Sequence, residues 1–167
     1  FAALASDARR EILARLFPRQ RDRLIDALRA MRLQCEKAAL EKALTELLAG
    51  LRHYRLYGVE SGFDPADKLE LDFAVNMARP LLDAEASAAL TEISRTLCKT
   101  PVRARFEQLS ATLTAKAVED TSFYRYSRLL SRNEVGSDPG TLALPVERFH
   151  AAAADRRSPP SPWDRRA

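Results

Sequence analysis

The sequence contains few of the residues that build metal centres, disulfide frameworks and phosphate-binding loops. It has two cysteines, two histidines and five glycines in 167 residues. Cys35 and Cys98 lie far apart without a Cys-x-x-Cys spacing, which favours free thiols in a reducing cytoplasm over a disulfide or zinc framework. The sequence also has no P-loop and no nucleophile elbow. We therefore expect no metal ion and no cofactor.

Long apolar runs and a strong excess of one charge are missing as well. No run approaches the roughly 20 apolar residues that span a membrane, and the first residues lack the basic and apolar regions of a signal peptide. The 27 basic and 23 acidic residues leave a net charge of +4, which permits but does not indicate a nucleic-acid partner. We expect a cytoplasmic protein without a membrane or nucleic-acid partner. Because the chain begins at Phe1 and not at a methionine, we expect a piece of a larger protein.

Helical periodicity is what the sequence does contain. Apolar residues recur every three or four positions, and capping residues or prolines mark the ends of most of these stretches. Asp83, for example, is expected to cap the helix that begins at residue 84. The tail 158–167 is rich in proline and is expected to be disordered. The predicted helices are 3–16, 20–35, 36–49, 66–79, 84–98, 102–109, 122–132 and 146–157.

Two segments depart from the helical pattern. Residues 53–57, His-Tyr-Arg-Leu-Tyr, either connect two helices through half-buried tyrosines or line a cleft, and the sequence leaves both interpretations open. Residues 111–116 alternate threonine with other residues, which predicts a short strand. A lone strand cannot satisfy its own backbone hydrogen bonds. We therefore expect it to pair with strands that this chain does not supply.

The densest group of polar and aromatic side chains lies at residues 118–139, and this composition suits sugar binding better than a packed core. Glu119 and Asp120 are adjacent carboxylates. Adjacent residues at a strand end point in opposite directions, so the pair is not expected to flank one bond at the roughly 5 Å separation of a retaining glycosidase. The alternative is that Asp120 caps the next helix and pairs with Arg125 and Arg128.

The same stretch resembles a known family. Val118-Glu-Asp-Thr-Ser-Phe-Tyr-Arg-Tyr126, Arg128-Leu-Leu130 and Asn133-Glu-Val-Gly-Ser-Asp-Pro139 resemble the signature of maltooligosyltrehalose synthase, or (1→4)-α-D-glucan 1-α-D-glucosylmutase. That family belongs to glycoside hydrolase family 13 and the α-amylase superfamily. Tyr54-Arg-Leu-Tyr57 is similar to a further segment of the family. Ala117 and Ser137 stand where the family usually has glycine, so a positive φ at either position would be strained.

The resemblance implies a mainly α chain that is one part of a (β/α)8 barrel enzyme. Residues 1–110 would form a helical insertion region. Residues 111–157 would belong to the barrel itself, with its sixth strand at 112–118 followed by a loop and a helix, and 158–167 would be the disordered tail. Because the barrel is incomplete in this chain, the remainder of the barrel domain is an expected partner.

The resemblance also implies a reaction. The family enzyme, an isomerase of trehalose biosynthesis, converts the reducing end of a maltooligosaccharide to an α,α-1,1 (trehalose) linkage by intramolecular transglycosylation. The resemblance places its catalytic carboxylates before Phe1 and after Arg157, so we assign no catalytic residue and expect the chain alone to be inactive. Side chains that grip sugar hydroxyls or cover sugar rings are expected to bind this maltooligosaccharide substrate. They are Lys116, Glu119, Asp120, Tyr124, Arg125, Tyr54, Asn133 and Glu134.

A free-standing helical interaction module is the competing interpretation. Such a module would bind acidic partners through its arginines, melt cooperatively and have no affinity for sugar. A fragment of the barrel enzyme would instead expose apolar surface near residues 111–118.

Overall fold

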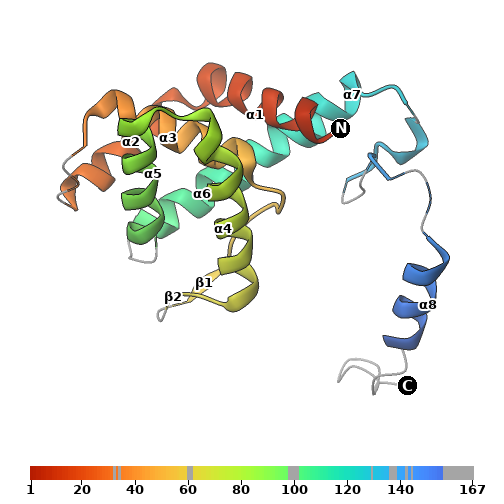
Figure 1. The fold of residues 1–167 in the computed structure, drawn as a ribbon. Coiled ribbons are helices and arrows are strands. Elements are labelled where there is room, and N and C mark those ends of the chain that lie inside the picture. Colours follow the sequence, from red (N-terminus) through yellow and green to blue (C-terminus); the bar gives the residue numbers. More distant parts are fainter. Residues whose placement is uncertain are drawn as a thin grey trace, which may run out of the picture.

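The computed structural model describes residues 1–31, 33, 35–59, 62–97, 102–128, 130–135, 139–141, 143 and 145–155. Most of them are helical, as the sequence predicted (Figure 1). Cys98 and the predicted disordered tail 158–167 lie outside the described residues. The main helices are α1 (Ala2–Leu16), α2 (Pro18–Ala30), α3 (Lys37–Gly50), α4 (Pro65–Ala78), α5 (Ala84–Thr96), α6 (Val102–Thr114) and α8 (Val146–Asp155).

Shorter elements connect these helices. A π-helix (Ala115–Ser122) and the short α7 (Phe123–Arg125) continue directly from α6. Two 3-10 turns occupy Arg79–Leu81 and Leu130–Arg132. Ahead of α4, β1 (Gly58–Val59) and β2 (Gly62–Phe63) pair as a small antiparallel hairpin.

Side-chain caps and prolines set the helix starts. Asp83 caps α5 as predicted, because its Oδ1 accepts a hydrogen bond from the Ala86 N–H at 2.9 Å. Asp64 caps α4 in the same way, because its Oδ1 accepts a hydrogen bond from the Asp67 N–H at 2.8 Å. Helix α2 begins at Pro18, earlier than the predicted residue 20, because proline is well suited to the first turn of a helix.

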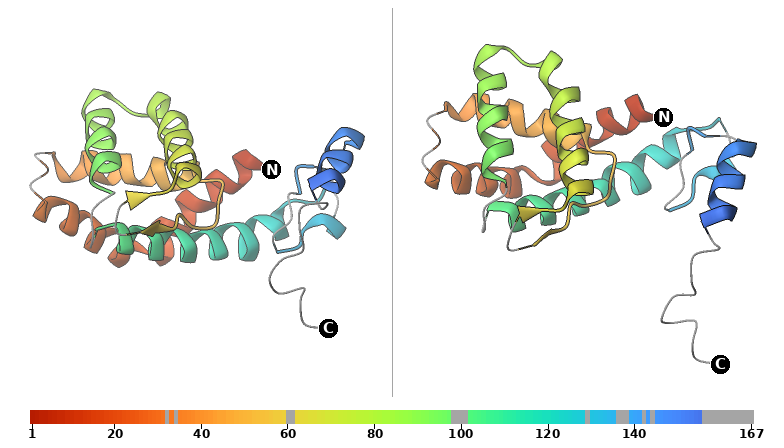
Figure 2. Two further views of the ribbon diagram at one scale, coloured as in Figure 1. Left: turned by 90° about the horizontal axis from the view of Figure 1, so that it is seen from below. Right: turned by 60° about the horizontal axis from the view of Figure 1, so that its bottom comes forward.

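Helix α3 lies at the centre of the core. It packs against α1, α2, α4 and α5, and it is therefore apolar on more than one side. In Figure 2, α6 and the π-helix form one long rod, and α4 and α5 stand side by side across it. The buried residues of α3 are Ala39, Leu40, Ala43, Leu44, Leu47, Leu48 and Ala49.

The predicted strand at 111–116 is wrong, and so is the sixth barrel strand at 112–118. Both segments are helical and pack against α1. Leu109, Leu113 and Ala117 are buried at four-residue intervals, so helical periodicity prevails over the strand preference of threonine. The apolar surface expected near 111–118 is likewise covered at Leu113 and Ala117. The division of the chain at residue 110 stays a prediction.

The structure bears on three further expectations for residues 117–132. Ala117 lies in helical backbone, so an alanine causes no strain there, whereas Ser137 lies outside the described residues. The predicted helix 122–132 is interrupted, because Tyr126 is extended at φ −98° and ψ 104°. Asp120 is inside the π-helix and does not cap the next helix.

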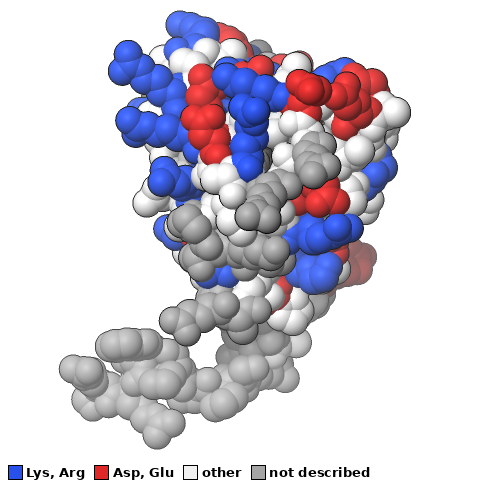
Figure 3. Space-filling model, turned by 90° about the vertical axis from the view of Figure 1, so that its left-hand side faces the viewer, with Lys and Arg blue, Asp and Glu red and all other residues white. Residues whose placement is uncertain are grey.

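Charged side chains are prominent on one face of the molecule (Figure 3). Basic and acidic side chains interleave on the face shown in Figure 3. Helix α8 stands to one side of the helical body in Figures 1 and 2, and its residues 146–154 are exposed. Of the helices described, none combines the length and the apolar character needed to cross a membrane.

Candidate functional site

Residues 51–57 run from α3 to β1 without helix or strand, and Glu70 fixes the first half of this segment. Glu70 lies on α4, is 1% exposed and accepts hydrogen bonds from the backbone N–H groups of Arg52 and His53. The Arg52 guanidinium adds two bonds to Glu70 at 3.0 and 2.9 Å, and it stacks on the Phe73 ring. These donors compensate the burial of the carboxylate.

Asp67 and Glu107 fix the second half of the segment. Asp67 Oδ2 accepts from the Tyr57 N–H at 2.8 Å. Glu107, on α6, accepts from the Gly58 N–H at 2.8 Å and from the Arg55 guanidinium at 3.0 Å. Buried carboxylates from two helices thus take the place of regular secondary structure in satisfying the backbone.

These three acids were not among the residues predicted from the sequence, although the sequence contains a signal for those on α4. On α4 the buried positions are Asp67, Glu70, Leu71, Ala74 and Ala78, which follow the helical period. A carboxylate within an apolar stripe is buried and must find donors. The irregular segment that follows α3 supplies those donors.

The fixed segment forms one wall of a cavity of about 530 Å³, which we call the aromatic cavity. The end of α6 and the π-helix form another wall. A π-helical turn inside a helix often marks a functional site, because the extra residue changes the direction of the side chains. The cavity is lined by Arg9, Arg52, His53, Tyr54, Arg55, Tyr57, Asp67, Thr114, Val118, Glu119 and Phe123.

Two of the eight predicted substrate-binding residues, Tyr54 and Glu119, line this cavity, and two more, Lys116 and Asp120, act on Tyr54 through their charges. The Tyr54 hydroxyl donates to Glu119 Oε2 at 3.3 Å, although the two residues are 65 positions apart. Burial raises the pKa of the Tyr54 phenol, the charges of Glu119 and Asp120 raise it further, and Lys116 opposes them. Lys116 itself is paired with Asp120 at 2.6 Å. Tyr54, Lys116, Glu119 and Asp120 therefore form one electrostatic group.

The remaining four predicted residues are not part of this group, and none of them lines the described part of the aromatic cavity. Arg125 binds Glu11 of α1 through two hydrogen bonds at 2.7 and 3.2 Å. Tyr124 is 85% exposed and Glu134 is exposed too. Asn133 Nδ2 donates to the carbonyl oxygens of Phe123 and Tyr126, so its amide holds the turn after α7.

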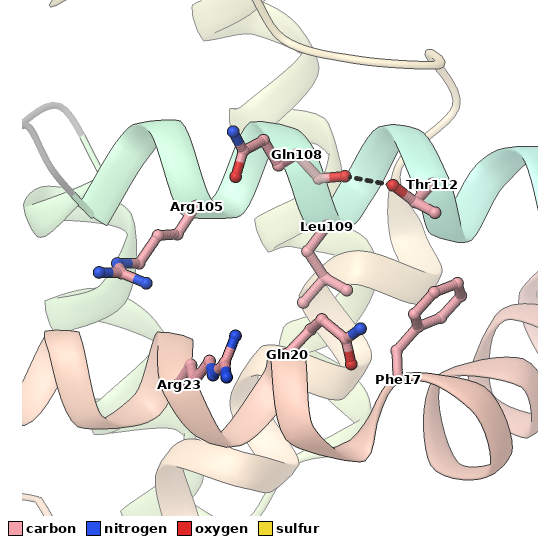
Figure 4. A pocket seen from close by; sticks show the side chains of 7 residues that line it. All are labelled: Phe17, Gln20, Arg23, Arg105, Gln108, Leu109 and Thr112. Atoms are coloured by element: carbon pink, nitrogen blue, oxygen red, sulfur yellow. Dashed lines mark hydrogen bonds between the residues drawn. The ribbon is translucent and has the colours of Figure 1, made fainter.

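A smaller cavity of about 270 Å³ lies between α2 and α6. Figure 4 shows Arg23 on α2 facing Arg105 on α6, with Gln20 beneath Leu109. Both arginines are exposed, so water solvates their charges and the arrangement requires no ligand. None of these residues was predicted from the sequence to have a functional role.

Cys35 is a half-buried free thiol whose pKa is raised by burial and by the charges of Glu92 and Glu85. In the part of the chain that the structure describes, no three His, Cys, Asp or Glu side chains are grouped to hold a metal ion.

Comparisons with known proteins point to one enzyme. The chain is 48% identical over 52 residues to the protein named "Putative maltooligosyl trehalose synthase" in two Mycobacterium tuberculosis strains, CDC 1551 and H37Rv. That match covers 31% of this chain and 7% of the curated relative. The solved structure of maltooligosyltrehalose synthase from Arthrobacter ramosus superposes with a TM-score of 0.76 at 32% identity, covering 93% of this chain and 19% of the solved chain. No protein-family model matches the chain.

Proposed function

We propose that this chain, which matches part of maltooligosyltrehalose synthase in sequence and in structure, forms a helical wall of the substrate site of such an enzyme. The observation that supports this most directly is the contact of Tyr54 with Glu119 across the aromatic cavity. Each residue comes from a segment that carries the sequence resemblance. The ligand would be a maltooligosaccharide.

The chemistry of the aromatic cavity suits a sugar. Tyr54 and Tyr57 expose large parts of their rings, and aromatic rings cover the apolar faces of sugars while polar groups bind the hydroxyls. Glu119 accepts hydrogen bonds, and the guanidinium of Arg55 donates them. The backbone of residues 51–57, which we call the tyrosine segment, is already fixed by Asp67, Glu70 and Glu107. This reduces the conformational entropy that is lost when a ligand binds.

The parent enzyme would carry out an intramolecular transglycosylation at the reducing end of the maltooligosaccharide. In the retaining scheme, two carboxylates cut and rejoin the glycosidic bond while the freed glucose stays bound. We assign no catalytic carboxylate to this chain. Its part would be to position the sugar and keep water away from the reacting bond.

Several finer assignments belong to the same proposal. The remainder of the barrel domain would be the partner that supplies the catalytic groups, in the cytoplasm. Direct sugar contacts of Tyr124, Arg125, Asn133 and Glu134 stay predictions. Arg125 would have to release Glu11 to make such a contact.

A sugar titration tests the proposal. We expect maltopentaose to shift the backbone NMR signals of residues 52–58 and 114–120 saturably, with few changes elsewhere. The substitution Tyr54→Ala should weaken binding at least about tenfold, because it removes the ring and its hydroxyl. Phe149→Ala is the matched control, since this ring is also exposed but lies on α8. Absence of binding, or shifts confined to other residues, would contradict the proposal.

A further inference from the structure

Arg9 on α1 is a buried cation at the junction of two cavities. Its side chain is 6% exposed, and it lines both the aromatic cavity and a neighbouring cavity of about 430 Å³. Among the described residues, Arg9 Nε has no hydrogen-bond partner. Burial lowers the pKa of Arg9 to about 10, while the charge of Glu70 opposes this change. The guanidinium is therefore still charged at neutral pH.

The neighbouring carboxylates are committed to other groups. Glu46 binds Arg10 at 2.7 Å, and Glu70 binds Arg52 at 2.9 Å in addition to two backbone N–H groups. Arg10 and Arg52 also line the second cavity, and each of them forms an ion pair with one of these carboxylates. Arg9 has no such ion pair with a described residue. A buried charge without a bonded counter-charge is unfavourable, so an anion that enters the second cavity gains by pairing with Arg9.

The walls of the second cavity define the rest of the ligand. Beside the charged residues, apolar side chains line it, namely Phe1, Leu51, Phe73, Met77, Leu81 and Val118. A carboxylate matches the fork of a guanidinium, and one negative charge balances one Arg9. An apolar body attached to that carboxylate would lie against the apolar walls.

We propose that Arg9 is the cation of a binding site for a carboxylate that carries an apolar body. A free carboxylic acid and an acidic side chain flanked by apolar residues offer the same chemistry. The site is the second cavity, whose lining includes neither Tyr54 nor Glu119, and it does not depend on the enzyme activity proposed above.

The test follows the Nε–H signal of Arg9 in 15N-edited NMR spectra of the whole chain. We expect hexanoate to shift this signal saturably and acetate to do so at least about tenfold more weakly, because each buried methylene contributes roughly a fourfold gain. Hexanamide, which has the same body without the charge, should not shift it. The peptide N-acetyl-Leu-Glu-Leu-amide distinguishes the two kinds of ligand. If it binds more tightly than hexanoate, the natural ligand is an acidic polypeptide segment. If it binds more weakly, the natural ligand is a free carboxylic acid.

Two variants complete the test. Arg9→Gln should abolish hexanoate binding, which is then followed through the backbone signals of residues 49–52. Arg23→Gln is the matched control, because Arg23 also lines a cavity but is exposed, and its binding of hexanoate should equal that of the unaltered chain. If Arg9→Gln does not fold, the comparison of hexanoate with hexanamide on the unaltered chain still tests the proposal. Equal responses to both, or a response of Arg9 Nε–H to maltopentaose alone, would overturn the proposal.

Discussion

At the scale of single residues, Glu119 has the clearest change of role. The sequence presents it as half of a carboxylate pair, whereas in the fold it accepts a hydrogen bond from Tyr54 and Asp120 pairs with Lys116. The two neighbouring acids thus bind different partners, as expected for adjacent residues. The backbone that separates their side chains is a π-helix and not the predicted strand.

The first residue-scale prediction concerns the ionisation of Tyr54. Its pKa is raised above the ordinary value of 10.0, first by burial and then by the charge of Glu119. The neutral phenol therefore stabilises the folded state below pH 10. This stabilisation is lost as the pH rises through the pKa of Tyr54 in the folded state. Glu119→Gln should lower the pKa of Tyr54, as measured by ultraviolet absorbance in an alkaline titration. Asp72→Asn, an exposed acid on α4, is the control. An unchanged Tyr54 pKa in Glu119→Gln would show that the contact is absent.

The second residue-scale prediction concerns Glu11. Hydrogen bonds from Arg125, and to a smaller extent from Arg15, lower the pKa of Glu11 from 4.5 to about 2. Because the folded pKa is depressed, the contribution of these contacts is complete above about pH 4.5 and is lost as the pH falls towards 2. Arg125→Gln should raise the pKa of Glu11 measured by carboxyl NMR. Arg128→Gln is a nearby control and should leave it unchanged. The reverse pattern would contradict the pairing of α7 with α1.

At the scale of elements, the irregular segment 51–57 depends on acids that belong to other elements. Glu70→Gln should destabilise the protein by about 3 kcal/mol, because it removes the buried charge that holds Arg52 and two backbone N–H groups. Chemical denaturation measures this loss. Asp72→Asn on the same helix breaks only an exposed pair with Lys68 and should cost less than about 1 kcal/mol. Equal costs would mean that Glu70 does not organise the segment.

Gly58 tests how closely this segment approaches α6. A Cβ atom at Gly58 would overlap Arg103 Cδ, because two non-bonded carbon atoms cannot approach so closely. Gly58→Ala should therefore cost about 1–3 kcal/mol of unfolding free energy. In an Arg103→Ala background the same substitution should cost less, because the clashing side chain is gone. Additive costs in this double-mutant cycle would exclude the close approach.

The sequence predicts the helices well and their irregular parts poorly. The cap at Asp83 and the apolar periods act within a few residues, so they are visible in a single sequence. The threonines near residue 112 favour a strand locally, but packing of Leu113 and Ala117 against α1 decides the outcome. The bonds of Glu70 and Glu107 to the tyrosine segment join residues 17 to 52 positions apart, and no local pattern predicts which donor each acid finds.

At the scale of the whole molecule, the chain has a continuous core of its own but spans only part of its relatives. The core extends from Ala8 on α1 to Ala117 on the π-helix. The chain covers 19% of the solved maltooligosyltrehalose synthase chain. A helical body that folds around its own core, and presents tyrosines on an internally fixed segment, is suited to serve as one wall of a larger site.

The most direct test of the proposed function is to incubate maltopentaose with this chain, alone and together with the remainder of the barrel domain expressed separately. We expect no product from the chain alone. With both parts present, we expect a non-reducing sugar with a trehalose end, and a lower yield when the chain carries Tyr54→Ala. Formation of the non-reducing sugar by the chain alone, or an undiminished yield with Tyr54→Ala, would contradict the proposal.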